Sequence, residues 1–164
     1  MCVGLTARIK KGLAEILCVS SRVIIDRVMS EIMASLIRLR PHHLLCTQGY
    51  EGRGYSKEFV ANMTAITARL RGEDKTSVQL VFSTDDICDA CPQKLAEDLC
   101  ARNDKMKLLD GKVCDYFALG EKQYIYQELV SEIKAKMTAA MMDDICGDCS
   151  WYSESACKDI IVCS

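Results

Sequence analysis

Cysteine is the residue type with the clearest chemical potential in this chain, because 11 of its 164 residues are cysteines. Two stretches repeat one arrangement, a Cys-x-x-Cys pair followed by a more distant third cysteine. The members of these two sets are Cys88, Cys91, Cys100, Cys146, Cys149 and Cys157. A Cys-x-x-Cys loop can turn both sulfurs toward one point, and thiolates bind zinc or the iron of iron–sulfur clusters. The sequence therefore predicts a metal site.

The spacing of these cysteines leaves the identity of the metal open. The two Cys-x-x-Cys pairs alone would make one four-sulfur zinc site, but Cys46, Cys100 and Cys157 would then have no role. A 4Fe–4S cubane is also held by four thiolates, so a subset of these seven cysteines is enough for one cluster. Two sites would need an eighth ligand, for which the sequence offers three candidates: His42, His43 and Cys114. We prefer one cubane cluster, with zinc as the alternative.

Four other residues are candidate contacts to this cofactor. His42 and His43, the only histidines, precede Cys46 by four and three positions, so either can share its face of a helix and touch the same metal. The other interpretation is that they are hydrogen-bonded core groups. Arg40 can neutralise a thiolate cluster or be a solvated surface arginine. Trp151 can shield a cluster from water or be a plain core residue.

Composition and motifs exclude several classes of function. The net charge of −2 and pI near 5.7, with no basic tract, argue against nucleic-acid binding. The chain has no phosphate-binding loop, dinucleotide fingerprint or nucleophile elbow, so no catalytic residue is assigned and a non-enzymatic role is preferred. An odd number of cysteines without a secretory signal indicates the reducing cytoplasm. The expected partner is a redox protein of unknown identity, and no membrane span is expected.

Residues 37–164 show the patterns of short helices and strands. We expect helices over residues 42–48, 57–71, 92–99, 106–119 and 127–141 and strands over residues 78–82 and 124–125. Ser56 is the expected cap of the second helix, and Gly120 the expected end of the fourth. The fold class is therefore mainly α with a small two-stranded β element, an α+β fold with cysteine-rich metal-binding loops between short helices. Aspartates beside these loops are expected to cap loop amides.

Residues 1–36 have a different pattern, in which charged residues interrupt every apolar run. This indicates an N-terminal amphipathic helical extension that is too charged to span a membrane. A second interpretation is that translation starts at Met29 or Met33, which would make the upstream residues an overlong gene start.

Several motifs, taken together, resemble the DUF1284 family of small prokaryotic proteins of unassigned function. These are Ile37-Arg-Leu-Arg-Pro-His-His-Leu-Leu-Cys46, Gly52-Arg-Gly-Tyr-Ser56, Asp85-Asp-Ile-Cys88 with Cys91-Pro92 and Cys100, and Ile145-Cys-Gly-Asp-Cys149 with Trp151 and Cys157. The resemblance covers residues 37–157 and implies iron–sulfur binding through these cysteines, with both histidines nearby. The first 36 residues depart from the family pattern, in which the chain begins close to the Arg-Pro-His-His motif.

The leading hypothesis is an iron–sulfur protein, with a 4Fe–4S cluster, that serves in electron transfer or redox sensing. One alternative is a structural zinc module that binds a partner protein, where the metal replaces a core that short helices cannot build. Another is a cluster-dependent enzyme in which His42 or His43 acts as acid or base.

Overall fold

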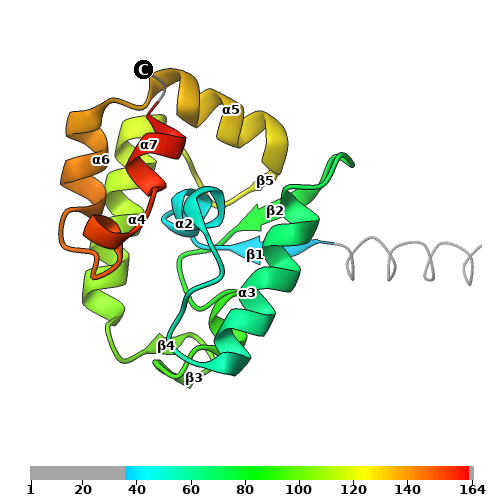
Figure 1. Cartoon of the computed structure of the whole chain (residues 1–164). Coiled ribbons are helices and arrows are strands. Elements are labelled where there is room, and N and C mark those ends of the chain that lie inside the picture. Colours follow the sequence, from blue (N-terminus) through cyan, green and yellow to red (C-terminus); the bar gives the residue numbers. More distant parts are fainter. Residues whose placement is uncertain (1–35, 163–164) are drawn as a thin grey trace, which may run out of the picture. The chain divides into compact units, whose positions relative to one another are not determined.

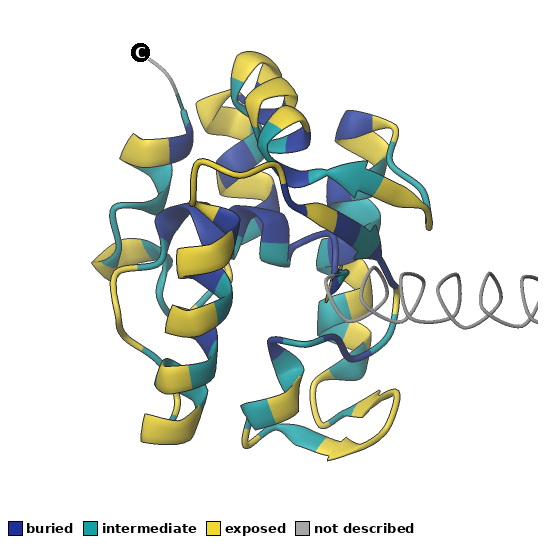
Figure 2. Ribbon diagram, turned by 90° about the vertical axis from the view of Figure 1, so that its right-hand side faces the viewer, coloured by how far each residue is buried: buried dark blue, intermediate teal, exposed yellow. Residues whose placement is uncertain are grey.

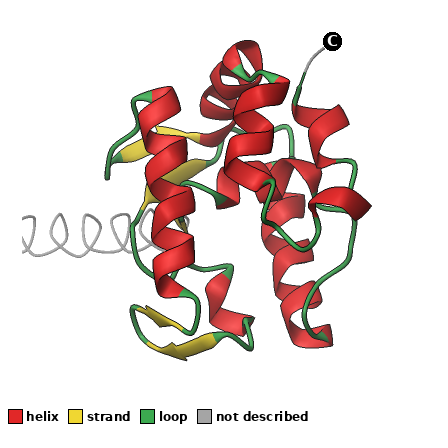
Figure 3. Ribbon diagram, turned by 90° about the vertical axis from the view of Figure 1, so that its left-hand side faces the viewer, coloured by secondary structure: helices red, strands yellow, loops and turns green. Residues whose placement is uncertain are grey.

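The computed structural model describes residues 36–162, and all that follows concerns this part of the chain. Its helices are α2 (His43–Gly49), α3 (Lys57–Leu70), α4 (Asn103–Phe117), α5 (Tyr126–Lys136), α6 (Ala139–Cys146) and α7 (Cys157–Ile161). Its strands are β1 (Ile37–Leu39), β2 (Ser77–Leu80), β3 (Lys94–Ala96), β4 (Leu99–Cys100) and β5 (Gln123–Ile125). Helices dominate over two small sheets, which confirms the α+β class (Figure 3). The helix predicted before residue 37 lies outside the described residues.

The larger sheet has the strand order β1-β2-β5. Strands β2 and β5 pair antiparallel and correspond to the predicted two-stranded element. Strand β1 was not predicted, and it pairs parallel to β2 with Ile37 opposite Val78 and Leu39 opposite Leu80. These four side chains are buried while Arg38 is exposed, as the alternation of a strand with one buried face requires. A parallel pair needs a crossover connection, which α2 and α3 supply.

Helix α2 lies near the middle of the fold, with α4, α6 and α7 on one side and α3 on the other (Figure 1). Its residues Leu44 and Leu45 are buried in the core with side chains from the sheet and from the surrounding helices. Figure 2 shows the buried residues gathered on the sheet and on the inner faces of the helices. The cysteine on α2, Cys46, is therefore held by the best-packed part of the fold. No helix within residues 36–162 is long and apolar enough to cross a membrane.

The helix predicted over residues 127–141 is wrong, because two helices occupy this part of the chain. The backbone of Met137 is extended, with φ −67° and ψ 127°, and this ends α5. Thr138 then caps α6, since its hydroxyl accepts a hydrogen bond from the amide of Met141 at 3.2 Å. The break redirects the chain so that Cys146 ends α6.

The helix predicted over residues 92–99 is also wrong. Strands β3 and β4 form an antiparallel hairpin there, with Lys94 opposite Cys100. Asp98 occupies the left-handed region with φ 62°, a conformation that turns the chain and that aspartate tolerates better than most residues. Helix α4 follows, and it ends at Ala118, which has a φ of 54°, rather than at Gly120.

Helices α2 and α7 pack closely because α2 ends in a glycine. A Cβ atom at Gly49 would overlap the sulfur of Cys157 and lie 2.9 Å from its Cα. Gly49→Ala should therefore push the two helices apart and lower the free energy of unfolding by about 1–3 kcal/mol, measured by urea denaturation. Gly111→Ala is the matched control, since a Cβ there meets nothing within 4 Å inside α4. It should raise stability by about 0.5–1 kcal/mol, and equal losses in both variants would contradict the packing argument.

Candidate metal centre

One cavity of about 200 Å³ gathers all seven cysteines that the sequence motifs identify. They are Cys46, Cys88, Cys91, Cys100, Cys146, Cys149 and Cys157, and each is a free thiol. The other four predicted contacts, Arg40, His42, His43 and Trp151, line the same cavity. Cys114 lies on α4 and is not among the lining residues. The fold thus brings together every predicted site residue, and their roles as ligands stay predictions.

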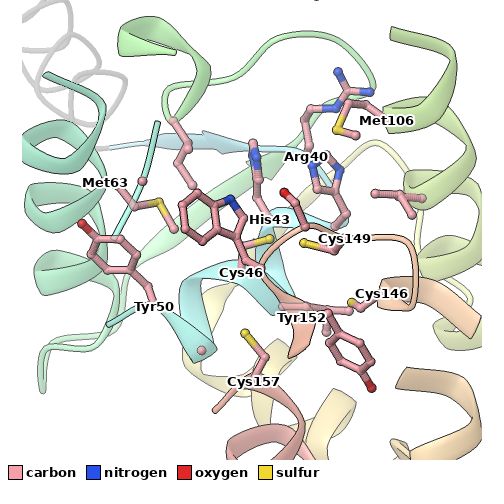
Figure 4. A pocket seen from close by; sticks show the side chains of 18 of the residues that line it. Arg40, His43, Cys46, Tyr50, Met63, Met106, Cys146, Cys149, Tyr152 and Cys157 are labelled. Carbon is pink, nitrogen blue, oxygen red and sulfur yellow. The ribbon is translucent and has the colours of Figure 1, made fainter. Parts of the chain in front are cut away.

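Four of these thiols, called here the four-thiol set, come from α2, from the end of α6, from the turn after it and from the start of α7. They are Cys46, Cys146, Cys149 and Cys157, and Figure 4 shows their sulfur atoms around the same part of the cavity. A tight turn closes between Cys146 and Cys149, because the amide of Cys149 donates to the carbonyl of Cys146 at 2.8 Å. Two distant parts of the sequence, Cys46 and residues 146–157, therefore converge on one space.

The thiols of the four-thiol set disfavour each other's ionisation. Burial raises the pKa of Cys46, and the neighbouring Cys146, Cys149 and Cys157 raise it further. Burial also raises the pKa of Cys146 to about 12, again helped by Cys149 and Cys157. Thiolates this close together in a buried place need a compensating positive charge. A bound metal supplies that charge and deprotonates its coordinating thiols.

The three remaining cysteines, called here the three-thiol set, lie on one continuous segment. Cys88 begins a 3₁₀ turn, Cys88–Ala90, and the amide of Cys91 donates to the Cys88 carbonyl at 2.9 Å. Cys100 belongs to β4, where the amide of Arg102 donates to its sulfur at 3.4 Å. The turn and the hairpin together bring the three side chains to the cavity wall.

Each histidine of the cavity is held by a buried carboxylate. The Nδ1 atom of His43 lies 2.6 Å from Oδ2 of Asp85, and Nδ1 of His42 lies 2.6 Å from Oδ1 of Asp110. Burial lowers the pKa of His42 to about 4, so this imidazole is neutral at pH 7. An ionised carboxylate can only accept, so Nδ1 carries the proton in both pairs, and in the neutral His42 the Nε2 atom keeps its lone pair. This is how proteins orient histidine ligands of metals.

Arg40 is a buried residue, which makes the interpretation as a surface arginine wrong. Its side chain is 1% exposed, and Nε and Nη2 donate to Oδ2 of Asp110 at 2.8 and 2.6 Å. Burial would raise the pKa of Asp110, but hydrogen bonds from His42 and Arg40 hold it below its ordinary value. The Nη1 atom of Arg40 is buried and has no hydrogen-bond partner among the described residues. An anionic group in the cavity would satisfy this donor.

Asp85 confirms the expectation that aspartates cap the amides of the cysteine loops. Its Oδ1 accepts from the amide of Cys88 at 3.0 Å, and its Oδ2 accepts from the amide of Arg40 at 2.6 Å. Burial opposes its ionisation, but His43 and these hydrogen bonds hold its pKa below the ordinary range. Asp85 therefore joins the first cysteine loop to the histidine segment.

Trp151 lies at the rim of the cavity rather than in the core. It is half-buried, and its ring meets the ring of Tyr55 edge-on with centroids 5.8 Å apart. Tyr55 also contacts Phe59, at 5.2 Å between centroids, and its side chain is 46% exposed. These three aromatic residues, called here the aromatic rim, line the same cavity as the thiols.

The distances between donor atoms show which residues of the cavity are already close enough to share one metal ion. Within residues 36–162, one group of at least three His, Cys, Asp or Glu residues has its donor atoms within 4.8 Å of one another. This group is His43, Asp85 and Cys88. No three sulfurs of the four-thiol set meet that limit, and neither do the three sulfurs of the three-thiol set.

Sequence reasoning missed Asp110 and the specific role of Asp85. Asp110 lies in the middle of α4, where an aspartate more often faces solvent, and nothing local marks it as the partner of Arg40. Asp85 was expected to cap a loop amide, but its contacts with His43 and Arg40 were not predicted. The signal for both was weak, because each acts through residues more than 40 positions away in the chain.

The comparisons with known proteins identify a family without a function. No curated protein and no solved structure matches the chain. A family model described as a protein of unknown function, DUF1284, matches residues 54–155, which is more than half of the 164 residues. The match includes five of the seven cavity cysteines, all except Cys46 and Cys157. The chain therefore belongs to the DUF1284 family.

Proposed function

We propose that this protein binds an iron–sulfur cluster, a 4Fe–4S cubane, through the four-thiol set. The observation that carries the proposal is the convergence of Cys46, Cys146, Cys149 and Cys157 on one cavity, all as free thiols. Four cysteine thiolates are the common ligand set of a cubane. Two of the four stand in a Cys-x-x-Cys turn, and the other two come from helices that pack against each other.

The spread of the four sulfurs favours a cluster over a single ion. Donors of one tetrahedral zinc ion, with bonds of about 2.3 Å, lie about 3.8 Å apart. No three sulfurs of the four-thiol set lie within 4.8 Å of one another, as noted above for residues 36–162. A cubane spans a larger volume and takes one thiolate at each corner. The cavity of about 200 Å³ offers the room that such a group needs.

The residues around the four thiols fit an anionic cluster. The unpartnered Nη1 of Arg40 is a buried donor at the cavity wall, and its positive charge offsets the negative charge of thiolates. The aromatic rim lines the same cavity and would shield a bound cluster from water. Hydrogen bonds to sulfur and the exclusion of water are the means by which a protein sets the potential of a bound cluster.

The proposed role is electron transfer or redox sensing, in the cytoplasm and with a redox protein as partner. A bound cluster would supply one-electron chemistry. The half-exposed Tyr55 places one edge of the site near the surface, where a partner can approach. Eight free cysteines among the described residues suit a reducing compartment. No catalytic residue is assigned.

Analysis of iron, acid-labile sulfide and zinc in protein purified without oxygen tests this proposal. We expect about four iron and about four sulfide per chain. Iron without sulfide, or zinc as the sole metal, would overturn the cluster and leave a protein in which metal serves structure.

A further inference from the structure

The cubane leaves the three-thiol set and both histidines without a role. We infer that Cys88, Cys91, Cys100 and the Nε2 atom of His43 hold a zinc ion, so that the cavity wall carries a second metal centre. This centre uses none of the four cysteines assigned to the cluster, and it does not depend on the cluster being present. Three cysteines and one histidine are a common ligand set of structural zinc sites.

His43 has the arrangement expected of a zinc ligand. Its Nδ1 proton is donated to Asp85 at 2.6 Å, which fixes the ring and leaves Nε2 as the ring nitrogen that can bind a metal. The other oxygen of Asp85 accepts from the amide of Cys88 at 3.0 Å. One buried carboxylate therefore positions both the imidazole and the first cysteine of the three-thiol set. Such carboxylate–histidine pairs are typical of zinc sites.

The distances around Cys88 suit a single ion. A ring nitrogen of His43, an oxygen of Asp85 and the sulfur of Cys88 lie within 4.8 Å of one another. With Zn–S near 2.3 Å and Zn–N near 2.1 Å, a sulfur and a nitrogen on one tetrahedral ion are about 3.6 Å apart. Cys91 and Cys100 lie outside this tight group but line the same cavity, and the zinc centre requires their side chains to turn toward the ion.

A backbone amide donates to one sulfur of the three-thiol set in a way that stabilises a thiolate. The amide of Arg102 donates to the sulfur of Cys100 at 3.4 Å. Donors aimed at sulfur favour the charged form, which is the form that binds metal.

The segment that carries these cysteines also needs a metal for its own stability. Strands β3 and β4 form an isolated two-stranded sheet, and Leu95 and Leu99 on it are 64% and 45% exposed. A two-stranded hairpin with so little buried apolar surface is marginally stable in water. A zinc ion that joins Cys88, Cys91 and Cys100 to His43 on α2 would fasten this hairpin to the rest of the fold.

Metal analysis of variants tests the second centre. Wild-type protein, purified without oxygen and dialysed against a chelator, should retain about one zinc ion per chain besides its iron. Cys88→Ser should lose zinc and keep iron and sulfide, whereas Cys146→Ser should lose iron and sulfide and keep zinc. Cys114→Ser, outside the cavity, should keep both. Zinc that is unchanged in Cys88→Ser, or iron and sulfide that fall with it, would overturn the zinc centre.

A pair of substitutions at His43 distinguishes the loss of a zinc ligand from loss of zinc through general misfolding. His43→Ala removes the fourth ligand and should lower retained zinc about 10-fold or more, whereas His43→Cys supplies a thiolate in its place and should restore it. Cobalt in place of zinc gives a second readout, since tetrahedral thiolate ligation colours the protein. Equal zinc and equal cobalt spectra in the two variants would exclude His43 as the ligand. Absence of iron from all variants would contradict the cubane. The zinc content of the two His43 variants would still show whether His43 is a zinc ligand.

Discussion

Cys146→Ser and Cys149→Ser should each abolish the visible absorption of the anaerobically purified protein and reduce its iron from about four per chain to near zero. Both residues belong to the four-thiol set and stand in one tight turn at the end of α6. A serine hydroxyl is a poor ligand for iron, so a cubane that has lost one of its thiolate ligands releases its iron more readily. Absorption spectra and iron content measure the effect directly.

Cys114→Ser is the matched control for these two variants. Cys114 is a free cysteine on α4, it is half-buried, and it is not among the residues that line the cavity. The variant should keep the full visible spectrum and the full iron content. An unchanged spectrum in both Cys146→Ser and Cys149→Ser would remove the four-thiol set as the cluster site. A spectrum lost in all three variants would point to a general effect of cysteine replacement.

The residues that line the cavity could be predicted from the sequence because the motifs that mark them are local. A Cys-x-x-Cys spacing, a histidine pair before Cys46 and a tryptophan after Cys149 can each be recognised within a few residues. Ser56 is a similar case, since the predicted cap does accept a hydrogen bond from the amide of Phe59 at 3.1 Å. Patterns of this kind depend on backbone geometry close in the chain, which tertiary packing seldom overrides.

The sequence divides six of these cysteines into two sets, but it could not place Cys46, because that depends on which distant helices pack together. Cys46 is closer in sequence to Cys88 than to Cys157, yet α2 packs on α7 and places it with the C-terminal cysteines. The histidine that we propose as a zinc ligand could not be predicted either. Two adjacent histidines look equivalent in the sequence, and only their carboxylate partners, Asp85 and Asp110, distinguish them.

The short segment between β1 and the middle of α2 contributes four residues to the site. Arg40, His42, His43 and Cys46 all lie in it, and each faces the cavity from the centre of the fold. The segment is held at Arg40 by two buried carboxylates from opposite sides, since Asp85 accepts its amide and Asp110 accepts its guanidinium. The position of every group in the segment therefore depends on these two contacts.

Asp110→Ala should be among the most destabilising single substitutions in the chain. Asp110 is 1% exposed and accepts hydrogen bonds from Arg40 and from both the amide and the ring of His42. Its removal leaves the guanidinium of Arg40 buried without a counter-charge, which costs about 3–5 kcal/mol. Urea denaturation of metal-free protein measures the loss, because metal binding would otherwise contribute to the difference.

Glu128→Ala gives the matched comparison, since it removes the carboxylate of an ion pair with Lys75 in which both side chains are more than half exposed. That loss should stay below about 1 kcal/mol. The double variant Arg40→Met with Asp110→Leu should recover part of the stability lost in Asp110→Ala, because it removes the stranded charge and fills its place with apolar atoms. Losses of similar size in Asp110→Ala and Glu128→Ala would mean that water reaches Arg40. The buried pair would then not be what holds the histidine segment against the cavity.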